Sequence, residues 1–286
     1  MSGMLKFLAR LLLAVAACGP VRATGSVDWV EFPALKPFEG RPVRIAAVQF
    51  KPEGTGPFPA VVMLHGCGGM LTGSGNLSAS FRLWGELMSR NGYVALLPDS
   101  LNPRGQRSLC AQQKRTILES RERVEDAYAA REWLAQQTNV AADRIGLMGW
   151  SNGGSGTLYG MRESRPQRGF RAAVAFYPGC RTLAKHSYTP YAPLLILIGE
   201  ADDWTPAAPC VEMAKRAKAD GAPIDIVTYP GAHHSFDRIN LPVRYRPEVR
   251  NLNKPDRLGA TVGEHPQARA DAMKRTLEFF ERTLKN

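Results

Sequence analysis

Residues 144–154 place the strongest constraint on how this chain can fold. The segment begins as a short apolar run, which is typical of a buried strand, and ends in Gly149-x-Ser151-x-Gly153. Small residues and a helix-like stretch follow at once. So sharp a strand–turn–helix connection needs glycine on both sides of the serine, because larger side chains would collide. The segment therefore predicts that the Ser151 hydroxyl projects beyond a strand end, at the start of a helix.

Apolar runs alternate with helix-like segments along most of the chain. Beyond the strand before Ser151, strands are expected at 43–50, 60–64, 93–98, 170–177, 194–198 and 224–229. Helices are expected at 81–90, 114–137, 152–161, 210–220 and 267–284. Residues 24–42 are expected to form an extended lead-in, and a proline- and arginine-rich loop is expected up to about residue 265. This alternation predicts one α/β domain over residues 24–286, with a mostly parallel sheet flanked by helices on both faces.

The marked polar clusters all come directly after predicted strands. They are His65-Gly66-Cys67, Asp99, Ser151, Asp202-Asp203 and His233-His234. Ligands of parallel α/β sheets bind outside the carboxyl ends of the strands, so these distant segments are expected to meet at one edge.

The order of the clusters predicts nucleophilic catalysis. A serine hydroxyl needs a base to take its proton, and the base needs a carboxylate to orient it. The order Ser, Asp, His is that of α/β-hydrolases. The residues alone leave Asp202 and Asp203 open as the acid, and His233 and His234 open as the base. His65 is expected to be a structural hydrogen-bonding residue.

Other residues near the predicted nucleophile also receive roles. The backbone amides of Cys67 and Asn152 are expected to form the oxyanion hole, because one follows a glycine-rich strand end and the other follows the nucleophile. Trp150 and Tyr177 are candidate walls of a substrate pocket, with packing in the core as the alternative. Arg104 is a candidate partner for a substrate carboxylate, with anchoring of its own loop as the alternative.

The N-terminus has the pattern of an export signal. Lys6 and Arg10 precede or flank a short apolar run, and a small-residue cleavage pattern ends at Ala23. Residues 1–23 are therefore expected to be a signal peptide, which makes the protein periplasmic or secreted. The alternative is a lipoprotein anchored through Cys18, because the residues before this cysteine resemble a bacterial lipobox.

The cysteine count agrees with export. Without the signal segment, four cysteines remain, and an even count in an exported protein favours disulfides. We expect the pairs Cys67–Cys110 and Cys180–Cys210, because each pair lies in loops at the same edge of the sheet. No spacing of cysteine and histidine suggests a metal site, and no cofactor is expected.

The charge does not indicate a nucleic-acid partner. The net charge is +11, but the lysines and arginines are spread along the chain without a long basic run. A small-molecule substrate is expected instead. The sequence contains nothing that determines the oligomeric state.

The motifs together resemble the dienelactone hydrolase family of α/β-hydrolases. The resemblance rests on the segments at 64–69, 97–105, 149–154, 199–206 and 229–236, and it covers roughly residues 40–285. The family's spacing of glycine, acid and proline selects Asp202, and its spacing of histidine and phenylalanine selects His234. The family's namesake enzymes carry cysteine where this chain carries Ser151, as many exported relatives do.

The resemblance implies an α/β-hydrolase fold and an enzyme of the serine esterase type. Its reaction is expected to be hydrolysis of carboxylic esters or lactones through an acyl-enzyme, by Ser151, Asp202 and His234. The alternatives are a peptidase or amidase of the same fold, and a catalytically silent binding protein on that fold.

Overall fold

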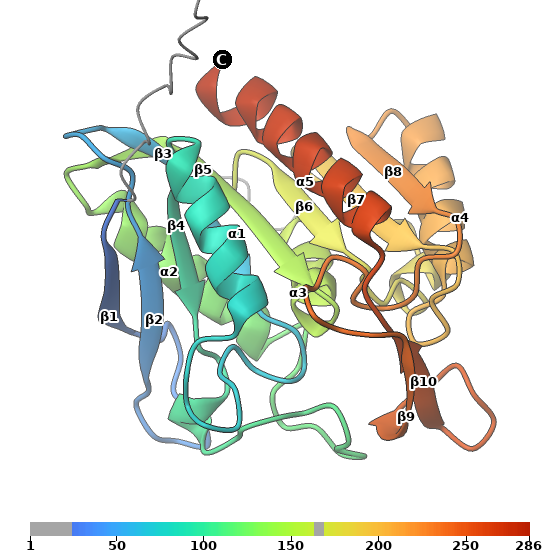
Figure 1. Ribbon diagram of the computed structural model, residues 1–286. Helices are drawn as coiled ribbons and strands as arrows, with labels where there is room; N and C mark the ends of the chain where they lie inside the picture. Colours follow the sequence, from blue (N-terminus) through green and yellow to red (C-terminus); the bar gives the residue numbers. More distant parts are fainter. Residues whose placement is uncertain (1–24, 163–168) are drawn as a thin grey trace, which may run out of the picture.

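The fold is built on an eight-stranded sheet whose strands occur in the order β1-β2-β4-β3-β5-β6-β7-β8 (Figure 1). The computed structural model describes residues 25–162 and 169–286, so the predicted signal peptide and Cys18 lie outside the described residues. The strands of the sheet are β1 (Val27–Pro33), β2 (Arg44–Phe50), β3 (Phe58–Leu64), β4 (Val94–Pro98), β5 (Val140–Trp150), β6 (Ala173–Phe176), β7 (Leu194–Gly199) and β8 (Ile224–Tyr229). All neighbouring pairs from β4 to β8 are parallel, whereas β1 and β2 are antiparallel to their neighbours.

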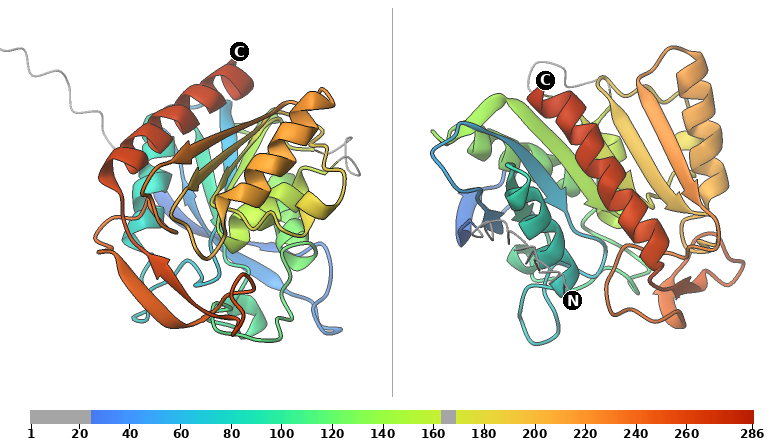
Figure 2. Two further views of the ribbon diagram at one scale, coloured as in Figure 1. Left: turned by 90° about the vertical axis from the view of Figure 1, so that its right-hand side faces the viewer. Right: turned by 45° about the horizontal axis from the view of Figure 1, so that its top comes forward.

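Helices cover both faces of this sheet. They are α1 (Ala79–Arg90), α2 (Glu122–Ala135), α3 (Asn152–Gly160), α4 (Ala207–Ala219) and α5 (Pro266–Phe280). The connection from β3 to β4 runs along the sheet in the direction opposite to the later connections between parallel strands. Because such connections are right-handed, α1 lies on one face of the sheet, whereas α2, α3 and α4 lie on the other. Figures 1 and 2 show α1 and α5 together on one face. The α/β fold with a mostly parallel sheet is therefore confirmed.

The central strands are buried because helices cover both of their faces. Every residue of β4, β6 and β7 is buried, which explains why these segments read as continuous apolar runs. Among the described residues, no helix is long and apolar enough to cross a membrane.

The N-terminal lead-in and the long loop before the last helix differ from the sequence prediction. The lead-in contains β1, which pairs with β2 at the sheet edge. The loop contains a separate two-stranded sheet, β9 (Arg244–Arg250) with β10 (Leu258–Val262). The prediction missed the hairpin because β9 carries three arginines and a proline. Figure 1 places this hairpin beyond the carboxyl ends of the central strands.

The predicted helix at 114–137 is shorter than expected, because α2 begins only at Glu122. The preceding segment is irregular, and its Ile117 packs into a second small core with Cys110 and the hairpin residues Val249 and Ala260. This contact draws the segment away from the helix axis towards the hairpin. Amphipathic spacing alone does not reveal such a contact.

Candidate active site

The turn at Ser151 has the strained geometry that its glycines predict. Ser151 connects β5 to α3 with a φ of 54°, which is in the left-handed region that non-glycine residues rarely adopt. A Cβ at Gly149 would overlap the carbonyl of Gly153, and one at Gly153 would overlap the carbonyl of Leu64. Both glycines are therefore required by close backbone packing.

The side chains of Ser151, His234 and Asp202 meet in one hydrogen-bonded line. Ser151 Oγ lies 2.9 Å from His234 Nε2, and His234 Nδ1 lies 2.7 Å from Asp202 Oδ2. The serine is partly exposed, whereas the imidazole and the carboxylate are buried. These residues follow β5, β8 and β7 respectively, so the parallel sheet brings three distant segments together at its carboxyl edge.

Asp202 is held by a compact turn. Its Oδ1 accepts hydrogen bonds from the amides of Trp204 at 2.9 Å and Thr205 at 2.8 Å. Its Oδ2 accepts one from Thr205 Oγ1 at 2.9 Å as well as contacting His234. The hydroxyl of Thr205 also lies 3.0 Å from His234 Nδ1. Sequence reasoning missed Thr205, although a threonine three residues after the acid is a signal for such a turn.

The neighbours of these two residues point elsewhere. The Asp203 carboxylate accepts a hydrogen bond from the Thr261 amide at 2.7 Å and pairs with Lys254 at 3.2 Å, so it faces the hairpin. His233 Nδ1 lies 3.0 Å from the carbonyl oxygen of Ala201. Of each adjacent pair, only Asp202 and His234 contact each other, as the family spacing predicts.

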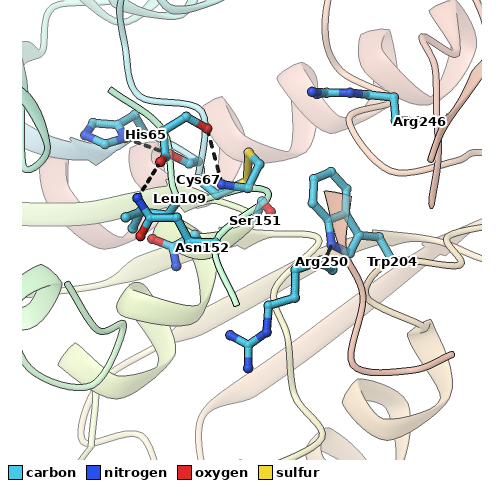
Figure 3. Close-up of a disulfide and its surroundings, with 12 residues drawn as sticks. His65, Cys67, Leu109, Ser151, Asn152, Trp204, Arg246 and Arg250 are labelled. Carbon is cyan, nitrogen blue, oxygen red and sulfur yellow. Dashed lines mark hydrogen bonds between the residues drawn. A yellow bond between two sulfur atoms is a disulfide. The ribbon is translucent and has the colours of Figure 1, made fainter. Parts of the chain in front are cut away.

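The glycine-rich loop after β3 lies against the Ser151 turn. A Cβ at Gly66 would come 3.6 Å from the Ser151 Cβ. The next residue, Cys67, accepts a hydrogen bond at its carbonyl oxygen from the Leu109 amide at 2.7 Å (Figure 3). Asn152 is the first residue of α3, and its side-chain amide donates to Glu119. The two residues predicted to supply oxyanion-binding amides thus flank the nucleophile candidate.

Both predicted cysteine pairs are joined as disulfides. Cys67 and Cys110 have Cα atoms 5.0 Å apart and connect the glycine-rich loop to the segment before α2. Cys180 and Cys210, also with Cα atoms 5.0 Å apart, connect the loop after β6 to α4. The first pair lies beside Ser151 (Figure 3).

One opening beside Ser151 has several aromatic rings in its lining and a volume of about 170 Å³; we call it the aromatic cleft. Its rings include Phe81, Trp84, Trp150 and Tyr177. Beneath them the buried Asp237 accepts hydrogen bonds from Trp84 Nε1 and Trp150 Nε1, both at 2.8 Å, and from the Tyr177 hydroxyl at 2.6 Å. Burial raises the pKa of the Asp237 carboxyl. Trp150 and Tyr177 border this cleft but are almost fully buried in the hydrophobic core, where Asp237 holds them in place.

A second opening reaches Ser151 from the side of α3. We call it the basic cleft; its volume is about 580 Å³. It shares Cys67, Ser151 and Trp204 with the aromatic cleft. Ser151 consequently lies where two chemically different openings meet.

The expectation that Arg104 contacts a substrate carboxylate is wrong. The Arg104 side chain is buried in a two-bonded ion pair with Asp126, with N–O distances of 2.8 and 2.7 Å, and it also donates to the carbonyl of Ser100. It lines neither opening at Ser151. The sequence does not reveal this because the two residues belong to different elements, the loop after β4 and α2. Arg104 therefore anchors its own loop, which is the alternative role.

The fold defines the class of protein as an α/β-hydrolase. Within that class, the chain belongs to the dienelactone hydrolase family, whose model matches residues 45–284. The family expected from the motifs is thus confirmed. Among the described residues, no group of three or more His, Cys, Asp or Glu side chains could hold a metal ion.

Known relatives agree with this classification. A Bradyrhizobium protein named "Probable 2-oxo-3-(5-oxofuran-2-ylidene)propanoate lactonase" is 27% identical over 74% of this chain and 85% of its own length. A dienelactone hydrolase-like promiscuous phosphotriesterase from metagenomic libraries has a TM-score of 0.65 at 16% identity, covering 91% of this chain and 99% of the other. An acylaminoacyl peptidase of Pyrococcus horikoshii has a TM-score of 0.63 at 18% identity, covering 92% of this chain and 42% of the other. The two structural likenesses show a shared fold.

Proposed function

We propose that this protein is a serine hydrolase of carboxylic esters and lactones that works through an acyl-enzyme. One observation carries the proposal: the unbroken line from Ser151 Oγ through His234 to Asp202, with contacts of 2.9 and 2.7 Å. A hydroxyl, an imidazole and a buried carboxylate in this geometry are what acyl transfer needs. The family, and the name of the Bradyrhizobium relative, favour lactones and esters as substrates.

The reaction starts at the Ser151 hydroxyl. Its oxygen attacks the carbonyl carbon of the ester while His234 Nε2 takes the proton. The Asp202 carboxylate stabilises the resulting imidazolium through Nδ1. The negative oxygen of the tetrahedral intermediate accepts hydrogen bonds from the amides of Cys67 and Asn152, the second of which begins helix α3.

The intermediate then collapses. The bond to the alcohol breaks, and His234 returns its proton to the leaving oxygen, which leaves an ester of Ser151. Water attacks this ester with His234 as the base, the acid is released and Ser151 regains its proton. In a lactone the leaving alcohol stays attached to the acyl chain, so the product is a hydroxy acid.

The test is covalent labelling combined with activity. A fluorophosphonate probe is expected to label the protein, and Ser151→Ala is expected to abolish both labelling and hydrolysis of phenyl acetate. Ser155→Ala is the matched control, because Ser155 Oγ lies in α3 and contacts the Ser151 carbonyl and the Gly179 amide rather than His234. Labelling that persists in Ser151→Ala would disprove the assignment. Hydrolysis of aminoacyl anilides in preference to esters would identify a peptidase instead.

We also propose that the protein is exported. The two disulfides support this, because disulfides persist in oxidising compartments. N-terminal sequencing of the mature protein tests the proposal. A start at Thr24 is expected, whereas a lipid-modified Cys18 would identify a lipoprotein.

A further inference from the structure

The basic cleft has an excess of positive charge directly beside Ser151. Among the described residues that line it, five are cations and one is an acid; the cations are Arg115, Arg181, Lys185, Arg250 and Arg257. The acid is Glu119, which already accepts hydrogen bonds from Arg115 at 2.7 Å and from the side chain of Asn152. The charge of the other four cations is therefore not balanced within the cleft.

The aromatic cleft differs in this respect, although arginines also lie at its rim. Arg246 forms an ion pair with Glu248 at 2.7 Å, and the charge of Arg244 acts on the same carboxylate. Arg238 lies next to Asp237 and acts on its carboxyl through its charge. The arginines of the aromatic cleft thus have acidic neighbours, whereas those of the basic cleft largely lack them.

Arg115 and Arg250 both line the basic cleft, and both are partly withdrawn from water. The side chain of Arg115 is only 14% exposed. Burial lowers its pKa, and the nearby charge of Arg250 lowers it further. The Nε of Arg250 is buried and has no hydrogen-bond partner among the described residues. Two like charges and an unused donor in one place favour an anion that would approach both groups.

The backbone of Arg250 is fixed by neighbouring parts of the site. Its amide donates to the carbonyl of Cys110 at 2.8 Å, and its carbonyl accepts from Trp204 Nε1 at 2.8 Å. Figure 3 shows Arg246 and Arg250, both from β9, extending to opposite sides of Trp204. The backbone of Arg250 is therefore held in place before any ligand binds, which lowers part of the entropic cost of binding.

From these contacts we propose that the basic cleft binds a substituent of the substrate whose oxygen atoms carry two negative charges. Arg250 and Arg115 hold this substituent on one side of the reacting ester, and the group in the aromatic cleft lies on the other side. The inference rests on the proposed hydrolase function. Guanidinium groups match carboxylate and phosphate oxygens through paired donors, so these are the anions expected. Two charges are expected because, in the part of the chain that the structure describes, four cations of the cleft have no acidic partner in its lining.

Matched aryl esters test the proposal. Phenyl acetate is the neutral reference for 5-acetoxyisophthalate, which carries two carboxylates on the alcohol side, and for 3-acetoxyphenyl phosphate, which carries a phosphate there. Phenyl benzoate is the reference for 5-(phenoxycarbonyl)isophthalate, which carries two carboxylates on the acyl side. The quantity measured is the ratio of kcat/KM for each dianionic ester to that of its neutral reference, at low ionic strength.

We expect this ratio to be about ten or more for at least one dianionic ester, as one or two charge-assisted hydrogen bonds would produce. The ester with the highest ratio shows whether the anion lies on the alcohol or the acyl side, and whether the cleft prefers carboxylates or phosphate. The ratio is expected to fall as salt is added, since the cleft is open to solvent.

Arg250→Gln provides the decisive comparison, with Arg246→Gln as its control on the same strand. Arg250→Gln is expected to lower the ratio by about tenfold, because one charge-assisted contact is lost. Arg246→Gln is expected to retain the ratio. Ratios near one for all dianionic esters, or a high ratio that survives Arg250→Gln, would overturn the inference while neutral esters still report the hydrolase. If the unmodified protein does not hydrolyse the neutral esters, that result would instead count against the proposed function itself.

Discussion

Two buried histidines at the carboxyl edge of the same sheet have nearest charged neighbours of opposite sign. His65 follows β3 and His234 follows β8, and both side chains are almost completely buried. The nearest charged group to His65 is the guanidinium of Arg123, at 3.0 Å from Nε2. The nearest to His234 is the carboxylate of Asp202, at 2.7 Å from Nδ1. The sign of the partner's charge therefore differs, although burial and position in the fold are alike.

His65 is arranged to stay neutral. Its Nδ1 donates to the carbonyl of Gly66 at 2.8 Å, and its Nε2 accepts from the Ser100 amide at 3.2 Å and from Arg123. Burial lowers the pKa of His65 well below 6.5, and the charge of Arg123 lowers it further. Arg123 also donates to the carbonyl of His65 itself. This histidine supports the loop that carries Cys67.

His234 has a carboxylate on one nitrogen and the Ser151 hydroxyl on the other. A carboxylate stabilises an imidazolium, so this ring can take up a proton during a reaction, whereas a guanidinium opposes that charge. Burial alone therefore does not distinguish the candidate base His234 from His65, whereas the charge of the nearest partner does.

The largest effect is expected from removing the charge beside His234. Asp202→Asn is expected to lower kcat for phenyl acetate by about 10⁴-fold, because the amide favours the wrong imidazole tautomer and cannot stabilise the imidazolium. Asp203→Asn is the control, since its carboxylate faces the hairpin. Its expected loss is under about threefold, in line with a partly exposed ion pair. A larger loss in Asp203→Asn than in Asp202→Asn would show that the wrong carboxylate was chosen.

The next effect concerns the charge beside His65. Arg123→Met is expected to lower the free energy of unfolding by about 3–5 kcal/mol, because it leaves the buried Asp126 with less compensation and the His65 carbonyl without its donor. Arg216→Met removes an exposed ion pair with Glu212 and is expected to cost less than about 1 kcal/mol. Urea denaturation measures both values. Equal stability of the two variants would contradict the structural role of Arg123.

The two disulfides separate stability from catalysis. Replacing Cys67 and Cys110 together by alanine, or Cys180 and Cys210 together, is expected to cost about 2–4 kcal/mol of stability in each case. Only the first replacement is expected to lower kcat as well, by roughly tenfold, because it frees the loop whose amide would bind the oxyanion. Melting curves and ester kinetics measure the two effects. An equal loss of kcat in both variants would argue against a positioning role for Cys67–Cys110.

The smallest effect is a pH dependence that comes from His65. The unfolded chain protonates this histidine near pH 6.5, whereas the folded protein keeps it neutral to well below that pH. The unfolded state therefore binds the extra proton, so stability falls as the pH drops below about 6.5 and is fully restored above it. In His65→Gln this contribution is absent. The difference in unfolding free energy between the two proteins should change by at most about 1.4 kcal/mol per pH unit; a difference independent of pH between 8 and 5.5 would exclude the mechanism.

The sequence by itself determined the alternation of the central strands and helices, the family and the three residues that meet at the candidate site. These features depend on local patterns: buried strands read as apolar runs, the turn at Ser151 needs glycines, and parallel strands place their ends at one edge. The two disulfide pairs were also predicted correctly, because the cysteines of each pair lie in loops at that edge. The neighbouring acids and histidines were separated only by the family's spacing, because adjacent residues share the same local pattern.

Only the tertiary structure decided the contacts between charged groups from different elements. Arg104 pairs with Asp126 on α2, and Arg250 on the hairpin approaches Arg115 in an irregular segment that the sequence pattern assigns to a helix. Such contacts depend on how far each side chain is buried and on which charges lie opposite, and both are properties of the packed chain. The same reason makes His65 a neutral support and leaves His234, beside Asp202, as the candidate base.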